Sequence, residues 1–394
     1  MTGSVGLTKT RTRPAYLTPT RIVLWGLLIL GLVAAFIRYT KGMGAISNMN
    51  NVYSFGLWIS LDLLCGVALA AGAFTTCAAV YILGKEEFRP LVKPAVLTGF
   101  LGYLAVVLAL LVDLGRPERI WHMLIYWNPH SPLFEIGLCV MTYTTVLFFE
   151  FSPTFFEWVG WNKIGHFIHK LVIPFVILGT VLSTLHQSSL GTLFVMMSDK
   201  INPLWHSAFM PLFFFVSAAT AGLAMVIFES TISMNAYGRK QETHLLGKLA
   251  KAIPWMLGLY LTLKISELLW SGDFHLLFEP GKFTPWFWIE ICAGVILPMI
   301  LFSLKAVRKT QTGLFLSSLL VILGLMFNRF NIGLLTWKRP AWDPGYVPHW
   351  MEFALSIGVI SGVIIVYDFV ARNMNLFHEE EHGHAPAEGR KRHA

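Results

Sequence analysis

Residues 103–122 read Tyr-Leu-Ala-Val-Val-Leu-Ala-Leu-Leu-Val-Asp-Leu-Gly-Arg-Pro-Glu-Arg-Ile-Trp-His, and residues 128–135 read Asn-Pro-His-Ser-Pro-Leu-Phe-Glu. The stretch begins inside an apolar run long enough to lie in lipid and leaves it at an acid, Asp113. A short aromatic loop follows, and the chain then enters a second apolar run that carries Glu135. Ionisable side chains are costly at membrane depth, so these acids are candidates for function.

The composition is that of a membrane protein. Of 394 residues, 55% are hydrophobic and 13% are charged, whereas soluble domains have about 25% charged residues. The apolar residues come in long blocks, which is typical of a polytopic helical membrane protein. The net charge of +8 comes from bases scattered among short loops, so membrane topology explains it better than nucleic-acid binding does. We therefore predict an all-α fold, a polytopic bundle of membrane-spanning helices.

Ten apolar runs are each long enough to span a membrane. Their approximate ranges are 21–39, 56–83, 93–114, 132–151, 167–187, 205–229, 250–270, 285–306, 313–333 and 350–371. We expect one transmembrane domain over 21–372. A basic tail, 1–20, precedes it, and a charged tail, 373–394, which we expect to be disordered, follows it.

The lysines and arginines are distributed unevenly between the two sides of the membrane. An even number of spans places both termini on one side, and that side carries 20 of these residues, against 9 on the other. Cytoplasmic loops are enriched in Lys and Arg, so we expect both termini to be cytoplasmic. The loop between Asp113 and Glu135 then faces outward, as do the residues at the end of the fifth span, which we place after His186 and Gln187.

Polar side chains gather in the outer third of the second to fifth spans, where consecutive helices are expected to pack together. They are Asp62, Asp113, Arg116, Trp121, His122, Glu135, His186 and Gln187, with Tyr103 about ten residues inside the third span. A quinone head group needs hydrogen-bond donors for two carbonyls, a carboxyl that leads protons to water, and apolar walls. We interpret these residues as the lining of one such pocket.

Simpler interpretations remain open for several of these residues. Asp113 and Arg116 could pair at a helix end, and Glu135 could be an acid that favours a helix N-terminus. Tyr103 could serve packing alone, and His186 could cap its helix. In the second span, Asp62 shares a face with small residues, so this helix could approach a neighbour closely.

A second set of ionisable residues lies in later spans: Glu229, Lys264, Glu267 and Glu290. Lys264 and Glu267 are three residues apart on one helix, so we expect them to pair. The set could form structural ion pairs, or it could carry protons together with water.

Cofactor motifs are scarce. The four cysteines, Cys65, Cys77, Cys139 and Cys292, form no Cys-x-x-Cys or Cys-x-x-Cys-His pattern, so neither iron–sulfur ligation nor covalent haem attachment is indicated. No two helices offer histidines matched at mid-depth, so we expect no haem b, although a di-haem cytochrome b anchor stays an alternative. We expect no metal site, and polar groups near the outer surface argue against a secondary transporter.

Several short motifs resemble those of the NrfD/PsrC family, and most closely its HybB branch, over nearly the whole chain. They are Gly-x-Trp-Ile-x-x-Asp62, Gly-Tyr103, Asp113-x-Gly-Arg116, Ser-x-Leu-Phe-Glu135, Thr-x-His186-Gln-Ser-Ser-x-Gly191, Pro-Leu-Trp205 and Ile-Phe-Glu229. The His-Gln-Ser-Ser and Leu-Phe-Glu segments are the most specific.

The resemblance implies a haem-free membrane subunit of a respiratory complex in a bacterial or archaeal cytoplasmic membrane. Its four-helix bundle would bind menaquinone and exchange electrons with a periplasmic ferredoxin-like iron–sulfur subunit. Tyr103, Glu135, His186 and Glu229 are then the main candidates for quinone chemistry and proton passage. The catalytic centre would lie in another subunit, such as an [NiFe] hydrogenase, a multihaem cytochrome or a sulfur-metabolising enzyme. The loop 328–349, with Arg329 and Trp337, is a candidate partner contact.

Overall fold

The computed structural model describes residues 18–238, 242–338 and 345–377. Over these residues it contains ten helices long and apolar enough to cross a membrane, which confirms the predicted number. These spans are Pro19–Lys41, Gly56–Ile82, Glu86–Asp113, Pro132–Val159, Val172–Val195, Met210–Tyr237, Thr243–Ser271, Thr284–Ser303, Gln311–Leu335 and Trp350–Asn373. Most of the two predicted tails, residues 1–17 and 378–394, lies outside the described residues.

Six of the spans are single long helices with short caps or extensions. They are α1 (Pro19–Lys41), α5 (Arg89–Asp113), α6 (Pro132–Val159), α8 (Val172–Val195), α9 (Met210–Tyr237) and α16 (Trp350–Asn373). The seventh span is α10 (Thr243–Leu249) followed by α11 (Ala252–Ser271). Short helices outside the spans are η1 (Met43–Ala45), η5 (Pro117–Leu124), α7 (Asn162–His169), η6 (Asp273–Leu277) and α14 (Lys305–Arg308).

Three spans contain wider π-helical turns. The second consists of α2 (Gly56–Trp58), η2 (Ile59–Cys65), α3 (Gly66–Leu69), α4 (Gly72–Cys77) and η3 (Ala78–Ile82). The eighth consists of α12 (Thr284–Ile289), η7 (Glu290–Ile296) and α13 (Leu297–Ser303), and the ninth of α15 (Gln311–Phe330) and η8 (Asn331–Leu335). Such turns are rare and are found frequently at functional sites. Here η2 carries Asp62 and η7 begins at Glu290.

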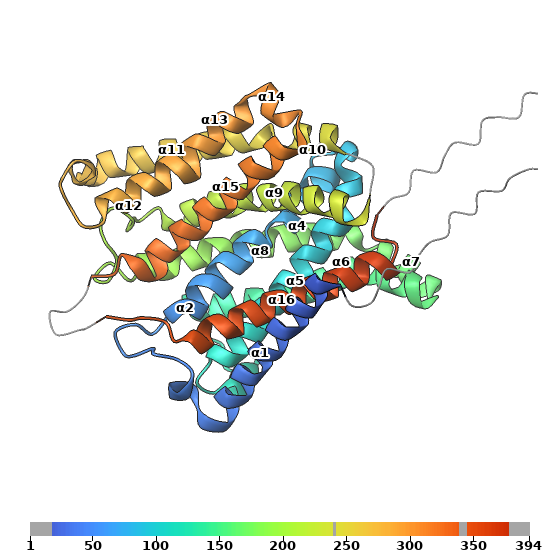
Figure 1. Cartoon of the computed structure of the whole chain (residues 1–394), viewed down its shortest axis with the longest axis horizontal. Helices are drawn as coiled ribbons and strands as arrows, with labels where there is room; N and C mark the ends of the chain where they lie inside the picture. Colours follow the sequence, from blue (N-terminus) through green and yellow to red (C-terminus); the bar gives the residue numbers. More distant parts are fainter. Residues whose placement is uncertain (1–17, 239–241, 339–344, 378–394) are drawn as a thin grey trace, which may run out of the picture.

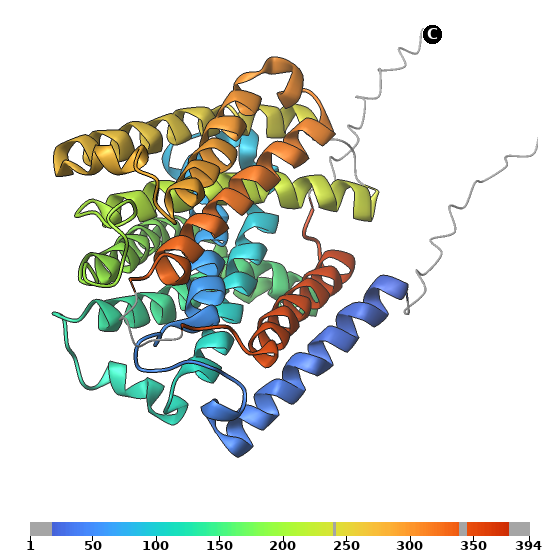
Figure 2. The same cartoon turned by 60° about the vertical axis from the view of Figure 1, so that its left-hand side comes forward.

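The spans form two four-helix bundles and one outer pair (Figures 1 and 2). In the N-terminal bundle, α4 packs on α5, α5 on α6, α6 on α8, and α8 back on α4. In the C-terminal bundle, α9, α11, the eighth span and α15 pack in the same closed manner. The pair α1 and α16 covers the outer side of α5.

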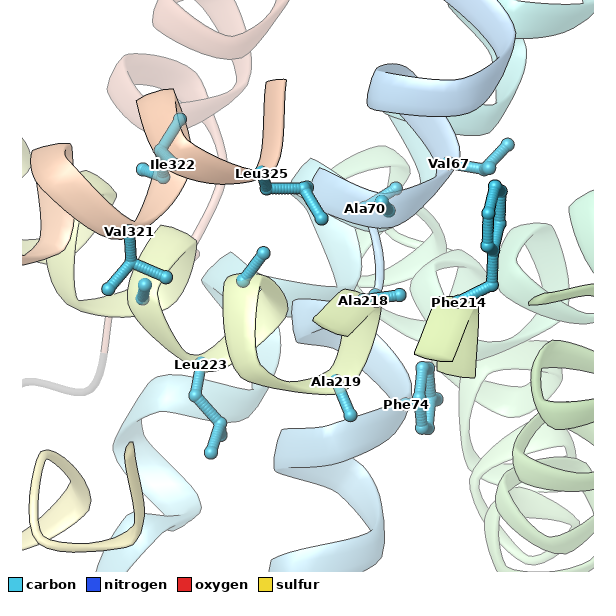
Figure 3. Packing of buried hydrophobic residues seen from close by; sticks show 14 of the residues in the cluster. Val67, Ala70, Phe74, Phe214, Ala218, Ala219, Leu223, Val321, Ile322 and Leu325 are labelled. Carbon is cyan, nitrogen blue, oxygen red and sulfur yellow. The ribbon is translucent and has the colours of Figure 1, made fainter. Parts of the chain in front are cut away.

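Helix α9 joins the two bundles, because it packs on α3, α4 and α8 as well as on α11 and α15. Figure 3 shows Ala218 of α9 between Ala70 and Phe74 of the second span, and Ala219 beside Phe74. Small residues permit this approach. A Cβ on Gly222 would lie 2.6 Å from the backbone of the second span, so the contact requires a glycine there.

The helix ends define two faces of the protein. The start of α1 and the end of α16 lie on the same face as α7 and α10, at the right of Figure 1, and we call this the terminal face. The opposite face, here the far face, carries η5, η6 and the loop before α16. The fifth span continues two turns beyond its predicted end, to Val195. His186 and Gln187 therefore lie inside α8 rather than at a surface, and our prediction of their depth was wrong.

Candidate functional site

A group of polar side chains lies buried in the N-terminal bundle, near the middle of its helices. The ring of Tyr103 on α5 contacts the ring of Tyr143 on α6 edge to face, with 4.7 Å between their centroids. The ring of His186 on α8 lies 5.9 Å from that of Tyr103. Ser183 and Gln187 of α8 lie beside the Tyr103 hydroxyl. We call Tyr103, Tyr143, Ser183, His186 and Gln187 the central cluster.

The central cluster is closed to solvent, yet most of its polar atoms lack hydrogen-bond partners. Tyr103, Tyr143, His186 and Gln187 have no exposed surface. The Tyr103 and Tyr143 hydroxyls and both ring nitrogens of His186 are without a partner among the described residues. Gln187 donates through Nε2 to the Val67 carbonyl oxygen, 3.1 Å away, but its Oε1 is unpaired. Unpaired buried polar groups are destabilising, so their concentration at one place indicates a ligand site.

The periodicity of α8 explains how its part of the cluster is formed. Ser183, His186, Gln187 and Leu190 recur every three or four residues, so they share one helix face, and all four are buried. This face points into the bundle while the rest of α8 meets lipid, because Leu178, Val181 and Leu185 are exposed in the isolated chain. The polar residues of α8 are therefore placed inside the bundle by the same pattern that orients the helix.

A narrow gap, too small to hold a water molecule, lies one to two turns from the central cluster, toward the far face. Asp62 of η2 and Asp113 of α5 both line it, together with Trp58 and Leu110. Ser356 of α16 donates to Asp62, with 2.8 Å between the oxygens. The structure therefore brings the two predicted aspartates together, at a gap next to the cluster.

The end of α5 is held by Arg38 rather than by Arg116. Arg38 of α1 is buried and donates to the carbonyl oxygens of Val112 and Leu114, at 2.9 and 2.7 Å. Arg116 is exposed, and no ion pair joins it to Asp113 in the described chain. The simple interpretation of Asp113 and Arg116 as a helix-end pair is therefore wrong.

Tyr346 closes the far-face end of this region. Its hydroxyl donates to Glu352 of α16 and accepts a hydrogen bond from the Leu57 backbone nitrogen at 3.0 Å. Burial raises the pKa of the Tyr346 phenol above its usual value. The Glu352 carboxylate also accepts from the backbone of Asn48 and His349. These contacts fix the loop before α16 against the start of the second span.

The remaining predicted residues of the pocket lie at its far-face edge. Glu135 is half-buried in the first turn of α6, where Ser131 caps the helix. Cys139 and Tyr143 follow it at intervals of four residues, so Glu135 shares a helix face with the central cluster. Trp121 and His122 lie in η5 with their rings 4.2 Å apart, and Trp121 is exposed. Arg116, Trp121 and His122 are thus brought to the surface near α6 and not into the cluster.

A second polar centre lies in the C-terminal bundle. The carboxylate of Glu290 accepts hydrogen bonds from Trp205 at 2.8 Å and from Asn328 and Asn331, both at 2.7 Å. Glu290 and Asn328 line a small cavity of about 30 Å³ between α9, α11, η7 and α15. Lys264 and Glu267 form the predicted ion pair, with 3.7 Å between Nζ and Oε2.

Arg329 belongs to this centre and not to a loop. It is 1% exposed, donates to the Asn328 side-chain oxygen at 2.7 Å, and lies 3.7 Å over the ring of Phe214. Trp337 is also buried, stacked on Tyr53. Our interpretation of both residues as a partner contact is therefore wrong, and part of that loop, 339–344, lies outside the described residues.

Glu229 lies apart from the second centre. It accepts hydrogen bonds from Thr98 of α5 and Tyr367 of α16, each at 2.5 Å. Asp368, the next residue of α16, pairs with Arg21 and Arg372 near the terminal face. The four residues predicted as one proton path therefore divide between two places in the fold.

Sequence reasoning missed several members of these sites. Tyr143 and Ser183 of the central cluster, Ser356, Arg38 and Glu352 stand singly in apolar runs and match no motif. The spacing of four between Glu135, Cys139 and Tyr143 is the signal that could have identified Tyr143.

Comparisons with known proteins agree with this arrangement. The family model described as polysulphide reductase, NrfD, matches residues 45–336. The chain is 42% identical over 379 residues to a Nitratidesulfovibrio vulgaris protein, covering 93% of this chain and 97% of that protein. It is 32% identical to the probable Ni/Fe-hydrogenase 2 b-type cytochrome subunit of Escherichia coli, covering 88% of this chain and 89% of that protein. It is 28% identical to the menaquinone reductase integral membrane subunit of N. vulgaris, covering 89% of each chain.

The family match covers both bundles, including the central cluster and the Glu290 centre. The alignment with the Escherichia coli relative covers 88% of this chain. This multi-pass membrane protein therefore belongs to the polysulphide reductase NrfD family.

Proposed function

We propose that this protein is a quinone-reactive membrane subunit that exchanges electrons between an iron–sulfur partner and menaquinone. The observation that carries the proposal is the central cluster, where buried hydroxyls and the His186 ring have no hydrogen-bond partner in the described chain. The name of one relative, a menaquinone reductase integral membrane subunit, supports the same choice of ligand.

The cluster offers the donors that a quinone head group needs. The Tyr103 hydroxyl and an N–H of the His186 ring can each donate to a carbonyl oxygen, and neither has an acceptor among residues 18–238, 242–338 and 345–377. The apolar walls come from helices α3, α5, α6 and α8. Because the cluster is closed, a head group would enter by moving apart the side chains of the neighbouring gap that Asp62 and Asp113 line. Quinone bound there accepts two electrons and two protons on reduction to quinol.

Glu135 has the position of a proton-exchanging group at the mouth of the site. It is half-buried at the far-face end of α6, on the helix face that leads through Cys139 to Tyr143. Asp62, Asp113 and Gln187 would line the binding region, and Arg116, Trp121 and His122 would line its outer edge. A carboxyl between a buried pocket and the surface can pass protons to water.

The histidine arrangement supports a haem-free subunit. His186 is the one buried histidine in the described part of the chain. A bis-histidine haem needs two such ligands facing each other. The name of the Escherichia coli relative, a b-type cytochrome subunit, keeps the di-haem cytochrome as the competing proposal.

The charge distribution supports a cytoplasmic terminal face, because 20 of the lysines and arginines are predicted on that side. The far face would then be periplasmic in a bacterial or archaeal cytoplasmic membrane. Exposed aromatic residues of the far-face loop, Trp121, Tyr126 and Trp127, offer a surface to a ferredoxin-like iron–sulfur subunit. A hydrogenase is our first candidate for the catalytic subunit, and a multihaem cytochrome or a sulfur-metabolising enzyme is the alternative.

Proton passage through the C-terminal bundle is a second proposal. The small cavity beside Glu290, close to the Lys264–Glu267 pair, favours it. Glu229 would act separately, through Tyr367, toward the terminal face.

The experiment is quinone turnover by the purified complex that contains this subunit. A menaquinone analogue should be reduced or its quinol oxidised, and a quinone-site inhibitor should stop the reaction while dye reduction by the partner continues. A reduced-minus-oxidised spectrum of the isolated subunit should show no haem bands. Haem bands would favour the di-haem cytochrome, and absent quinone turnover would contradict the proposed function.

A further inference from the structure

Glu150 is a carboxylic acid in the membrane interior that the proposed function does not use. It lies in α6, nine residues before the helix ends at Val159, and is only partly exposed. Within the described residues its carboxylate forms no hydrogen bond and no ion pair. An acid that is neither paired nor at a helix end has no evident structural role, and such residues in membrane proteins commonly conduct protons.

The carboxylate of Glu150 lies next to the central cluster. A Cβ on Gly179 of α8 would lie 3.4 Å from Glu150 Oε1 and 3.1 Å from Tyr143 Cε2. Both atoms therefore border the same small gap between α6 and α8, which exists because residue 179 is glycine. Side chains on a helix lean toward its N-terminus, so Glu150 extends from its own position toward Tyr143. Tyr143 in turn contacts Tyr103.

Other polar groups of the N-terminal bundle lie between Glu150 and the terminal face. Cys77 of α4 and Tyr81 of η3 are close enough to interact with it electrostatically. Tyr81 lies beside Arg89, whose side chain is 53% exposed at the start of α5. The order Arg89, Tyr81, Glu150, Tyr143, Tyr103 thus runs from the terminal face to the central cluster, within the N-terminal bundle.

We propose that Glu150 is the proton relay between the central cluster and the terminal face of the membrane. The inference rests on the proposed function, and it adds a second route to the one through Glu135. In quinone reduction, the iron–sulfur partner supplies two electrons and is oxidised, and an O–H bond forms at each carbonyl oxygen of the quinone. One of the two protons passes through Glu150, which is reprotonated from the terminal face, and the other passes through Glu135. Quinol oxidation reverses each step.

This route has an electrical consequence. The partner would deliver electrons from the far face, where Trp121 and Trp127 are exposed. The proton that arrives through Glu150 comes from the opposite face, so turnover moves charge across the membrane. If all protons passed through Glu135, electrons and protons would use the same face and turnover would be electroneutral.

The test is the membrane potential that the whole complex builds in liposomes, measured with a voltage-sensitive dye during turnover of a menaquinone analogue. Glu150→Gln should abolish the potential and lower quinone-linked turnover about 10²-fold or more, within the range seen for groups that transfer protons. Glu157→Gln is the matched control, since Glu157 lies seven residues further on the same helix with a half-exposed side chain and a 4.0 Å pair to Lys93. It should behave like the unmodified protein.

Infrared spectroscopy separates a proton relay from a structural role. The difference spectrum between oxidised and reduced quinone should contain a carboxylic C=O band that Glu150→Gln removes and Glu157→Gln retains. If Glu150→Gln does not assemble, Glu150→Asp keeps the acid and should retain the band and part of the potential. An unchanged potential per quinone in Glu150→Gln, or no potential in the unmodified complex, would overturn the proposal while leaving quinone binding intact. Absence of quinone turnover in the unmodified complex would instead contradict the proposed function.

Discussion

The rings of Tyr103 and His186 lie 5.9 Å apart between α5 and α8, and neither the Tyr103 hydroxyl nor the two His186 nitrogens has a hydrogen-bond partner in the described chain. The fold therefore buries one hydroxyl and two ring nitrogens without giving them hydrogen-bond partners in the described chain. Natural proteins pair most buried polar groups, so the two residues carry a cost to stability that a ligand would offset. The relationship leads directly to a test of the site.

Tyr103→Phe keeps the packed ring and removes only the hydroxyl, and His186→Leu keeps a buried side chain of similar length. Each should reduce quinone-linked turnover about 10²–10⁴-fold, as expected when a positioned donor is lost, because a carbonyl of the quinone loses its partner. Each should also leave thermal stability unchanged or raised, since an unpaired polar group disappears. The measurements are turnover with a menaquinone analogue and the melting temperature in detergent.

Tyr39→Phe is the control for these variants, because Tyr39 is 54% exposed on α1, outside the N-terminal bundle. It should have the turnover of the unmodified complex. If Tyr103→Phe and His186→Leu bound and turned over quinone normally, the central cluster would not be the quinone site.

Glu135→Gln tests the far-face route for protons. Glutamine has the size of the acid but cannot exchange a proton, so quinone-linked turnover should be abolished while assembly and dye reduction by the partner stay intact. The measurement is turnover with quinone and with a soluble dye on the same preparation. Glu118→Gln, in the exposed helix η5, should leave both activities unchanged. Normal quinone turnover in Glu135→Gln would exclude Glu135 from the proton route.

The number and type of the helices could be predicted because lipid enforces long apolar runs. The ends of the helices could not be predicted from the sequence where polar residues are buried inside the protein, because such residues look like the end of an apolar run. The run His186-Gln187-Ser188-Ser189 looks like the end of a span, yet α8 continues to Val195, and Gln187 donates to Val67 inside the bundle. We placed Arg329 in a loop for the same reason. Its guanidinium is in fact buried in the C-terminal bundle, where it donates hydrogen bonds to Asn328 and Ser217.

The candidate site was predicted in part. Tyr103, His186 and Gln187 come together as expected, and Asp62 meets Asp113 at the adjacent gap. Tyr143 and Ser183 could not be recognised from single positions, because tyrosine and serine are ordinary residues in membrane helices. Tyr143 and Ser183 belong to the cluster because α6 packs on α8, and this helix pairing is not visible in the sequence.

Glu290 should stabilise the C-terminal bundle strongly. Glu290→Ala would leave three buried donors, on Trp205, Asn328 and Asn331, without their acceptor, and would remove a negative charge near Arg329. Loss of one partner from a buried charged network costs about 3–5 kcal/mol. We expect a clearly lower melting temperature in detergent. Glu279→Ala is the control, because Glu279 is exposed and its carboxylate pairs with the exposed His275 at 3.7 Å, and it should melt normally. Equal melting of both variants would show that the network does not stabilise the bundle.

Gly222→Ala and Gly26→Ala should change stability in opposite directions. Alanine is favoured over glycine inside a helix by about 0.5–1 kcal/mol, and a Cβ on Gly26 of α1 would meet nothing within 4 Å, so Gly26→Ala should be neutral or stabilising. A Cβ on Gly222 would lie 2.6 Å from backbone atoms of Ala71 and Gly72, which cannot move as a flexible side chain could. Forcing α9 away from the second span should cost about 1–3 kcal/mol, seen as a lower melting temperature in detergent. A Gly222→Ala protein as stable as the unmodified one would mean that the two bundles are not held together by this contact.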